Sequence, residues 1–145
     1  MLKGLSPLLT PDLLHALAAA GHGDVIAIVD VNFPAARLAR RLILLPGVDT
    51  PAVLNTILSV LPVDDFDPYP VRVMRVVGDA TSVPDAVRDC TVILERHGLV
   101  VPAALDRHLF YREAAEASVI VQTGERRLYG NVLLTKGVIR PDAML

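Results

Sequence analysis

A few polar side chains in two short segments of the sequence could do chemistry. His22 lies between two glycines in the segment GHGD, and Asp30 follows the apolar run just after it. The second segment, Tyr129-Gly130-Asn131, adds a phenol and an amide. Because imidazole titrates near neutral pH, His22 could transfer protons, while the carboxylate, phenol and amide could hold a polar ligand by hydrogen bonds.

Each of these residues also has an ordinary structural interpretation. A histidine that follows a helix is more often a surface or capping residue than a catalyst, and an aspartate at a strand end commonly forms a turn. The second segment could be a tight turn in which Gly130 and Asn131 take positive φ angles. From the residues alone, both interpretations stay open.

Several motifs that would indicate other chemistries are absent from the sequence. There is no GxGxxG, no GxxxxGK[ST] and no GxSxG, so the usual phosphate loops and the nucleophile elbow are missing. Cys90 lies within an expected helix and has no adjacent base, which argues against a thiol nucleophile. The histidines lack HxH or HxxxH spacing, so the sequence gives little support for a metal site.

The composition predicts one globular domain spanning residues 1–145. Hydrophobic residues make up 52% of the chain but aromatic residues only 4%, so the core must consist mainly of aliphatic side chains. The mean hydropathy of +0.47 is high for a small domain, and it predicts either deep burial or a surface covered by other subunits. Because the net charge is −2 and there is no basic cluster, nucleic acid is not an expected partner.

The sequence also predicts a cytoplasmic protein without a membrane segment. A single cysteine excludes an intrachain disulfide and fits a reducing compartment. The N-terminal segment has neither the apolar core nor the cleavage pattern of a signal peptide. The longest weakly charged region, 42–63, is interrupted by Pro46, Gly47 and Pro51, so it cannot form a transmembrane helix.

Apolar strands that alternate with helices must position the candidate residues. Thr10 and Pro11 begin a helix that Gly21 is expected to end, and VIAIV at 25–29 is typical of a strand buried on both faces. Further helices are expected at 50–62, 82–98 and 104–117, and further strands at 41–45, 71–77, 118–124 and 131–137. This order predicts an α/β domain with three layers, α/β/α, around a mostly parallel sheet.

The strand at 25–29 separates His22 from Asp30. His22 precedes this strand and Asp30 follows it, and five residues of strand span roughly 17 Å. The two side chains of one chain should therefore not touch. Either the turn at His22 folds back over the sheet, or a neighbouring subunit brings one residue to the other.

Taken together, these motifs resemble those of the fucose mutarotase and ribose pyranase family. The resemblance rests on GHGD at 21–24, DVNFP at 30–34, and TGE followed by YGN within 123–131. It covers nearly the whole chain, with a looser match over 36–100. The family has two branches, and Gly23, Phe33-Pro34 and Gly130 resemble the fucose mutarotase branch.

The resemblance implies a ring-shaped homodecamer of α/β subunits with sites between neighbours, acting on a monosaccharide without a metal or an organic cofactor. It assigns the catalytic role to His22. It assigns contacts with the substrate to Asp30, Arg107, Tyr111, Tyr129, Gly130 and Asn131.

The activity that the resemblance implies is that of an isomerase, which interconverts the α and β anomers of L-fucose or a related sugar. In mutarotation the hemiacetal ring opens and recloses on the other face, so the ring oxygen gains a proton while the anomeric hydroxyl loses one. His22 would move these protons. Asp30, Tyr129 and Asn131 would hold sugar hydroxyls. Arg107 would hold a hydroxyl or a developing oxyanion.

Other functions stay open beside this one. The chain could be a ribose pyranase, which interconverts pyranose and furanose forms, or a non-catalytic monosaccharide-binding accessory protein of sugar uptake. A purely structural ring component is a third alternative. Fucose mutarotases often carry a histidine where this chain has Ala36, so the preferred sugar also stays open.

Overall fold

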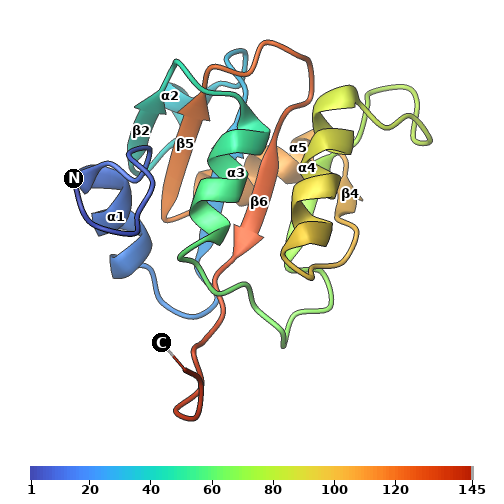
Figure 1. Ribbon diagram of the computed structural model, residues 1–145. Helices are drawn as coiled ribbons and strands as arrows, with labels where there is room; N and C mark the ends of the chain where they lie inside the picture. Colours follow the sequence, from blue (N-terminus) through green and yellow to red (C-terminus); the bar gives the residue numbers. More distant parts are fainter. Residues whose placement is uncertain (145) are drawn as a thin grey trace.

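A six-stranded mixed sheet forms the centre of the computed structural model, which describes residues 1–144 of the chain (Figure 1). The strands are ordered β2-β5-β1-β6-β3-β4 across the sheet. β1, β2 and β5 are parallel to one another, as are β3 and β4, while β6 runs antiparallel between β1 and β3. The strand bounds are β1 Val25–Val29, β2 Leu42–Leu45, β3 Val71–Met74, β4 Ala103–Leu105, β5 Val119–Thr123 and β6 Val132–Thr135.

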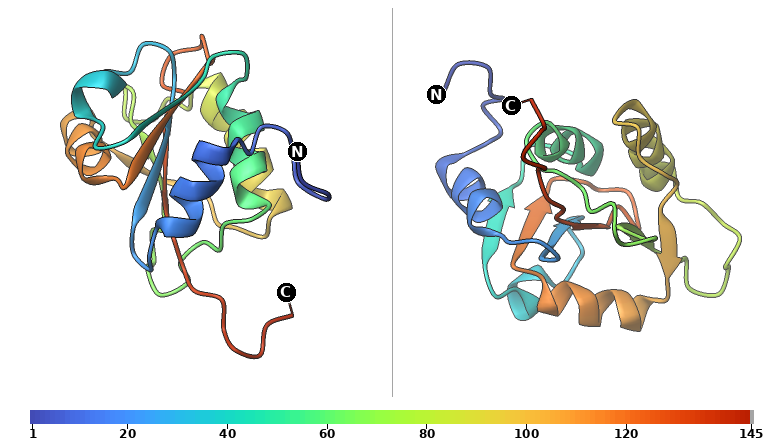
Figure 2. Two further views of the ribbon diagram at one scale, coloured as in Figure 1. Left: turned by 90° about the vertical axis from the view of Figure 1, so that its left-hand side faces the viewer. Right: turned by 90° about the horizontal axis from the view of Figure 1, so that it is seen from below.

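Helices cover both faces of this sheet, which confirms the expected three layers. Figure 2 shows α1, α3 and α4 on one face and α2 and α5 on the other. The helix bounds are α1 Pro11–Ala19, α2 Ala35–Leu38, α3 Thr50–Leu58, α4 Asp85–Arg96 and α5 Arg107–Glu116. Only β6 opposes the common strand direction, so the prediction of a mostly parallel sheet is also confirmed.

β1 is buried on both faces, as its sequence predicts. Ile26 and Ile28 pack into the core beneath α1 and α3, whereas Ala27 and Val29 pack into the core on the α5 side. The side chains alternate because successive residues of a strand point to opposite faces. This central strand therefore fixes the positions of His22 before it and Asp30 after it.

Side-chain caps fix the starts of α1, α3 and α5, although the predicted end of α1 needs correction. Thr10 accepts a hydrogen bond from the Leu13 N–H and begins α1 as expected. The C-cap of α1 is Ala20, not Gly21, and the Gly21 N–H instead binds the Asp24 carboxylate. The glycine that needs a left-handed conformation is Gly23, at φ +85°.

Two elements were not expected from the sequence, and two strands that are consecutive in the chain do not pair. The short helix α2 and the strand β4 have no counterpart in the sequence prediction, so the helix expected at 104–117 begins only at Arg107. β5 and β6 follow one another in the chain, but β1 lies between them. Within residues 1–144, no helix combines the length and the apolar character that crossing a membrane requires.

Candidate active site

The turn that carries His22 is fixed to the strand beside it. Gly23 donates a backbone hydrogen bond of 2.8 Å to the carbonyl of Lys136, which follows β6. The Lys136 ammonium in turn binds the carbonyls of Leu17 and Ala20 at the end of α1. A cation is favourable at a helix C-terminus, so Lys136 holds the helix and the His22 turn together.

His22 forms a hydrogen bond with a carboxylate that the sequence did not point to. Its Nε2 lies 3.1 Å from Oδ1 of Asp64, and the side chains are 47% and 7% exposed, respectively. Burial alone would raise the pKa of Asp64, but hydrogen bonds from the Phe66 backbone and from His22 lower it. An ionised carboxylate only accepts hydrogen bonds, so Nε2 donates the proton and Nδ1 carries the lone pair of the neutral imidazole.

An aromatic ring and a cation surround this pair. The Phe66 ring lies 5.6 Å from the imidazole, centroid to centroid, and the Arg140 guanidinium lies 5.6 Å from the centroid of the same Phe66 ring. Arg140 is paired with Asp65 at 2.7 Å. The segment that follows β6 therefore reaches the surroundings of His22.

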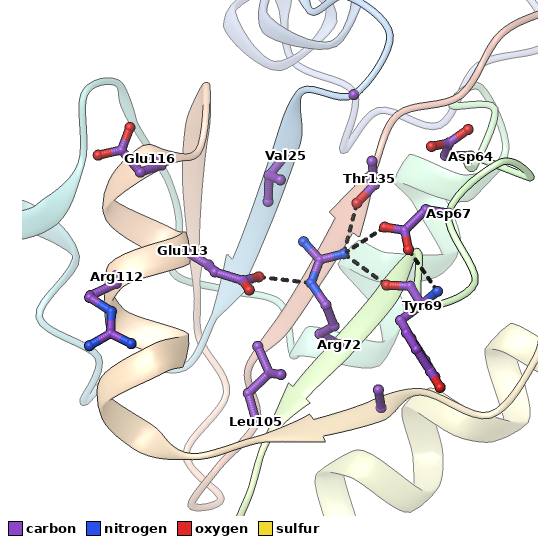
Figure 3. A pocket seen from close by; sticks show the side chains of 12 residues that line it. Val25, Asp64, Asp67, Tyr69, Arg72, Leu105, Arg112, Glu113, Glu116 and Thr135 are labelled. Carbon is purple, nitrogen blue, oxygen red and sulfur yellow. Dashed lines mark hydrogen bonds and ion pairs between the residues drawn. The ribbon is translucent and has the colours of Figure 1, made fainter.

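A pocket of about 880 Å³ lies at this end of the sheet, with Gly23 and Asp64 in its lining (Figure 3). Arg72 reaches into it from β3, and its side chain is only 10% exposed. Its guanidinium donates hydrogen bonds to Glu113 at 2.8 Å, to the Tyr69 carbonyl at 3.0 Å and to Thr135 at 2.7 Å. Arg72 thus joins β3, β6 and α5 and stabilises the wall of the pocket.

Asp30 and Asn131 meet at the opposite end of the sheet. The Asp30 N–H donates to the Asn131 side-chain oxygen at 2.8 Å, and both residues are only 3% exposed. Burial raises the pKa of Asp30, because it disfavours the charged carboxylate. Hydrogen bonds from three backbone groups and from Asn131 oppose that shift, so Asp30 also organises the turn around it.

The turn at Tyr129-Gly130-Asn131 differs from the expected one. The residue with a positive φ is Tyr129, at 62°, and not Gly130 or Asn131. Gly130 is needed for a different reason, because a Cβ there would lie 2.5 Å from the Cγ of Glu125. The Tyr129 hydroxyl accepts a hydrogen bond of 3.2 Å from the Val77 N–H, which leaves its own proton free for donation.

Arg107 and Tyr111 lie on α5, in different surroundings. Arg107 is the first residue of the helix and lines a pocket of about 250 Å³ together with Val77. The Val77 N–H also binds the Tyr129 hydroxyl, so Arg107 and Tyr129 have Val77 as a common neighbour. Tyr111 is half-buried and packs edge-on against Phe33, with the ring centroids 5.3 Å apart.

The structure thus divides the predicted residues between two ends of the sheet. Asp30, Tyr129, Gly130 and Asn131 lie together at the carboxyl end of β1, with Arg107 nearby, whereas His22 lies at its amino end. The alternative in which the turn folds back is wrong, since His22 contacts Asp64 and Phe66 instead.

Neither a metal site nor a reactive thiol is present in the part of the chain that the structure describes. No three His, Cys, Asp or Glu side chains among residues 1–144 are arranged to hold a metal ion. Cys90 is buried in α4, and desolvation raises the pKa of its thiol to about 12. The prediction that Cys90 is not a nucleophile is consistent with this burial.

Comparison with known proteins places this arrangement in a family. A sequence profile of the RbsD / FucU transport protein family matches residues 3–139. The fucose mutarotase of Bos taurus is 39% identical over 150 residues, which cover 97% of this chain and 96% of that protein. The structure of the fucose mutarotase of Streptococcus pneumoniae in complex with L-fucose is 37% identical, with a TM-score of 0.90 and coverage of 96% and 100%.

A more distant structure shares the fold alone. RbsD of Bacillus subtilis, complexed with D-ribose, is 20% identical and has a TM-score of 0.75 over 97% of this chain and 100% of that one. The profile match and the 39% identity over nearly the full length confirm the resemblance seen in GHGD, DVNFP and YGN. The chain belongs to the RbsD / FucU transport protein family.

Proposed function

We propose that this protein is an isomerase that interconverts the α and β anomers of L-fucose. The similarity to fucose mutarotases, at 37–39% identity over nearly the whole chain, supports this activity. The ribose-bound relative is only 20% identical, which favours fucose over ribose as the substrate. Asp30 and Asn131, at the carboxyl end of β1, provide hydrogen-bonding groups for a sugar. The His22–Asp64 pair provides a base.

His22 carries the proton transfer in this mechanism. Its Nδ1 takes the proton of the anomeric hydroxyl while the bond between C1 and the ring oxygen breaks, and the ring oxygen is protonated in the same opening. The free hydroxyl proton of Tyr129 is suited to that second transfer, because Val77 occupies the acceptor side of the phenol. Rotation about the C1–C2 bond and the reverse steps then close the ring as the other anomer.

The remaining residues bind the sugar. Asn131 and Asp30 form the floor of the site, Arg107 holds a hydroxyl or the developing oxyanion, and Tyr111 contributes to the wall beside Phe33. Asp64 acts through His22, because it fixes the tautomer and the direction of the ring. No metal or organic cofactor has a part in these steps.

Because its two halves lie at opposite ends of β1, the site is complete only between subunits. The amino end of one subunit, with His22, faces the carboxyl end of the next, with Asp30 and Asn131. Such a head-to-tail contact closes into a ring when the rotation between neighbours permits. We expect a homodecamer in the cytoplasm, built from single-domain subunits of residues 1–145.

The observation that carries this proposal is the His22–Asp64 pair, and NMR saturation transfer on L-fucose tests it. The wild-type protein should exchange the anomers faster than the spontaneous rate. The exchange rate of Asp64→Asn should be lower by roughly ten- to a hundredfold, which corresponds to the loss of one hydrogen bond to a charged group. Exchange at the spontaneous rate despite L-fucose binding would instead identify a non-catalytic accessory protein. Faster pyranose–furanose exchange of D-ribose would identify a ribose pyranase.

A further inference from the structure

Glu125 is a buried carboxylate that the mechanism does not use. It lies in the connection between β5 and β6 and is only 3% exposed. Arg127 donates three hydrogen bonds to the Glu125 carboxylate. The Arg127 backbone N–H and Nε lie 2.9 Å from Oε1, and its Nη2 lies 2.9 Å from Oε2. Burying a carboxylate is unfavourable unless it is fully paired. The hydrogen bonds from Arg127 therefore stabilise the charged form of Glu125 in the interior.

The Glu125 side chain supports the turn that precedes β6. Its Cγ would lie 2.5 Å from a Cβ at Gly130, so the turn rests directly on the Glu125 side chain. From the other side, the Thr50 hydroxyl donates a hydrogen bond of 2.7 Å to the Gly130 carbonyl. Within the turn, the Asn131 N–H binds the Tyr129 carbonyl at 2.8 Å. Gly130 is therefore held between Glu125 and Thr50, with Tyr129 and Asn131 on either side.

The Glu125 backbone holds the other half of the same cluster. Its carbonyl accepts a hydrogen bond of 3.0 Å from the N–H of Val31, the residue after Asp30. One residue thus contacts both the Asp30 segment and the Gly130 turn. Arg127 also forms an ion pair of 2.6 Å with Asp89 on α4, so the Glu125–Arg127 pair is connected to that helix.

We infer that Glu125 is a positioning residue for sugar binding, held in place by Arg127 and acting through the Tyr129-Gly130-Asn131 turn. This role rests on the proposed function, since it assumes that the turn contacts the sugar. Tyr129 has a positive φ, which a non-glycine residue keeps only where its surroundings enforce it. The Glu125 side chain, which Arg127 fixes through the carboxylate, and the Thr50 hydroxyl provide that enforcement.

Kinetics of L-fucose exchange in Glu125→Gln test this role. Glutamine keeps the size of the side chain but cannot keep the paired charge. KM for L-fucose should rise roughly tenfold, and kcat should fall with it, because the turn carries both the sugar-binding Asn131 and the proton-donating Tyr129. A purely structural role would lower the folded fraction, and thus the apparent kcat, at an unchanged KM. Asp85→Asn, in an exposed pair with Arg88 on the same helix as Asp89, is the matched control and should change neither value.

Two further measurements keep the inference falsifiable. If Glu125→Gln does not fold, Arg127→Lys, which keeps the charge at a half-exposed position but loses the guanidinium hydrogen bonds, should show the same rise in KM to a smaller extent. Without sugar, the amide hydrogens of Gly130 and Asn131 should exchange faster in either variant than in the wild type. An unchanged KM together with unchanged amide exchange in the folded variants would overturn the inference. A wild-type protein that neither binds nor isomerises L-fucose would refute the proposed function. Amide exchange would still test whether Glu125 holds the turn.

Discussion

At the scale of single residues, the state of His22 follows from its partner. Asp64 is ionised and accepts the hydrogen bond from Nε2, which leaves Nδ1 as the basic nitrogen of a neutral imidazole. Nearly half of the His22 side chain is exposed, so the imidazole can be reached by a ligand from outside the subunit. The residue is therefore oriented like a catalytic base and not packed like a core histidine.

His22→Gln should remove most of the catalysis and leave sugar binding largely intact. General acid–base catalysis contributes roughly 10²- to 10⁴-fold, so the exchange rate of L-fucose anomers should fall within about that range. Asn131→Ala is the contrasting variant, because it should weaken both binding and rate. NMR exchange and sugar titration measure the two effects, and a wild-type exchange rate in His22→Gln would exclude His22 as the base.

Gly130→Ala should destabilise the protein because the added methyl group would overlap the Glu125 side chain. The Cβ would lie 2.5 Å from Cγ of Glu125, and overpacking of this kind costs about 1–3 kcal/mol. Gly47→Ala is the matched control, since nothing lies within 4 Å of a Cβ at that position. Chemical denaturation measures both variants, and equal stabilities would contradict the close contact at Gly130.

At the scale of secondary-structure elements, local patterns predicted most of the fold. The apolar run of β1 and the Thr-Pro start of α1 were recognisable because each depends on neighbouring residues only. β4 and α2 were missed because they are short, and β4 is only partly buried, so neither has a clear periodicity. The position of β1 between β5 and β6 depends on long-range pairing, which no local pattern contains.

The same limit explains what was missed in the site. Asp64 lies in the loop after α3, and its pairing with His22 joins segments that are far apart in the sequence. The doubled aspartate of VDDF was the only visible signal, and it is equally typical of a turn. The positive φ of Tyr129 was unpredictable because glycine is the usual residue for that conformation, and the glycine beside it serves a packing contact instead.

The Glu125–Arg127 pair predicts how the connection between β5 and β6 responds to acid. Hydrogen bonds from Arg127 lower the pKa of Glu125 from its ordinary value of 4.5. Below that value the unfolded chain binds the proton more readily than the folded one, so the free energy of unfolding should fall as the pH drops below 4.5. Denaturation at several pH values measures this loss.

Glu125→Gln provides the comparison for this acid effect. The variant should be less stable than the wild type at neutral pH, because Arg127 loses a partner. It should also lose less stability on acidification, since the titrating group is gone. If the wild type and the variant lost the same stability between neutral pH and pH 3, roughly, the Glu125 carboxylate would not be the titrating group.

At the scale of the whole molecule, exposed apolar side chains support the proposed association of subunits. Leu44 on the edge strand β2 is 59% exposed, and Leu128 beside the Tyr129 turn is 66% exposed. Light scattering should therefore give a mass well above the 15.6 kDa of one chain. Leu44→Lys should weaken assembly and lower the exchange rate together, whereas a monomer with full activity would exclude sites shared between subunits.

The placement of His22 and Asn131 at opposite ends of the sheet has a genetic consequence. A loss-of-function allele that affects one end should complement an allele of the same gene that affects the other end. In the ring that we propose, assembly from both mutant chains would give some interfaces where the intact end of one chain meets the intact end of the other. In a random, equal mixture about a quarter of the interfaces would be of this kind. Two alleles that each encode an inactive protein should therefore restore anomer exchange when they are expressed in the same cell.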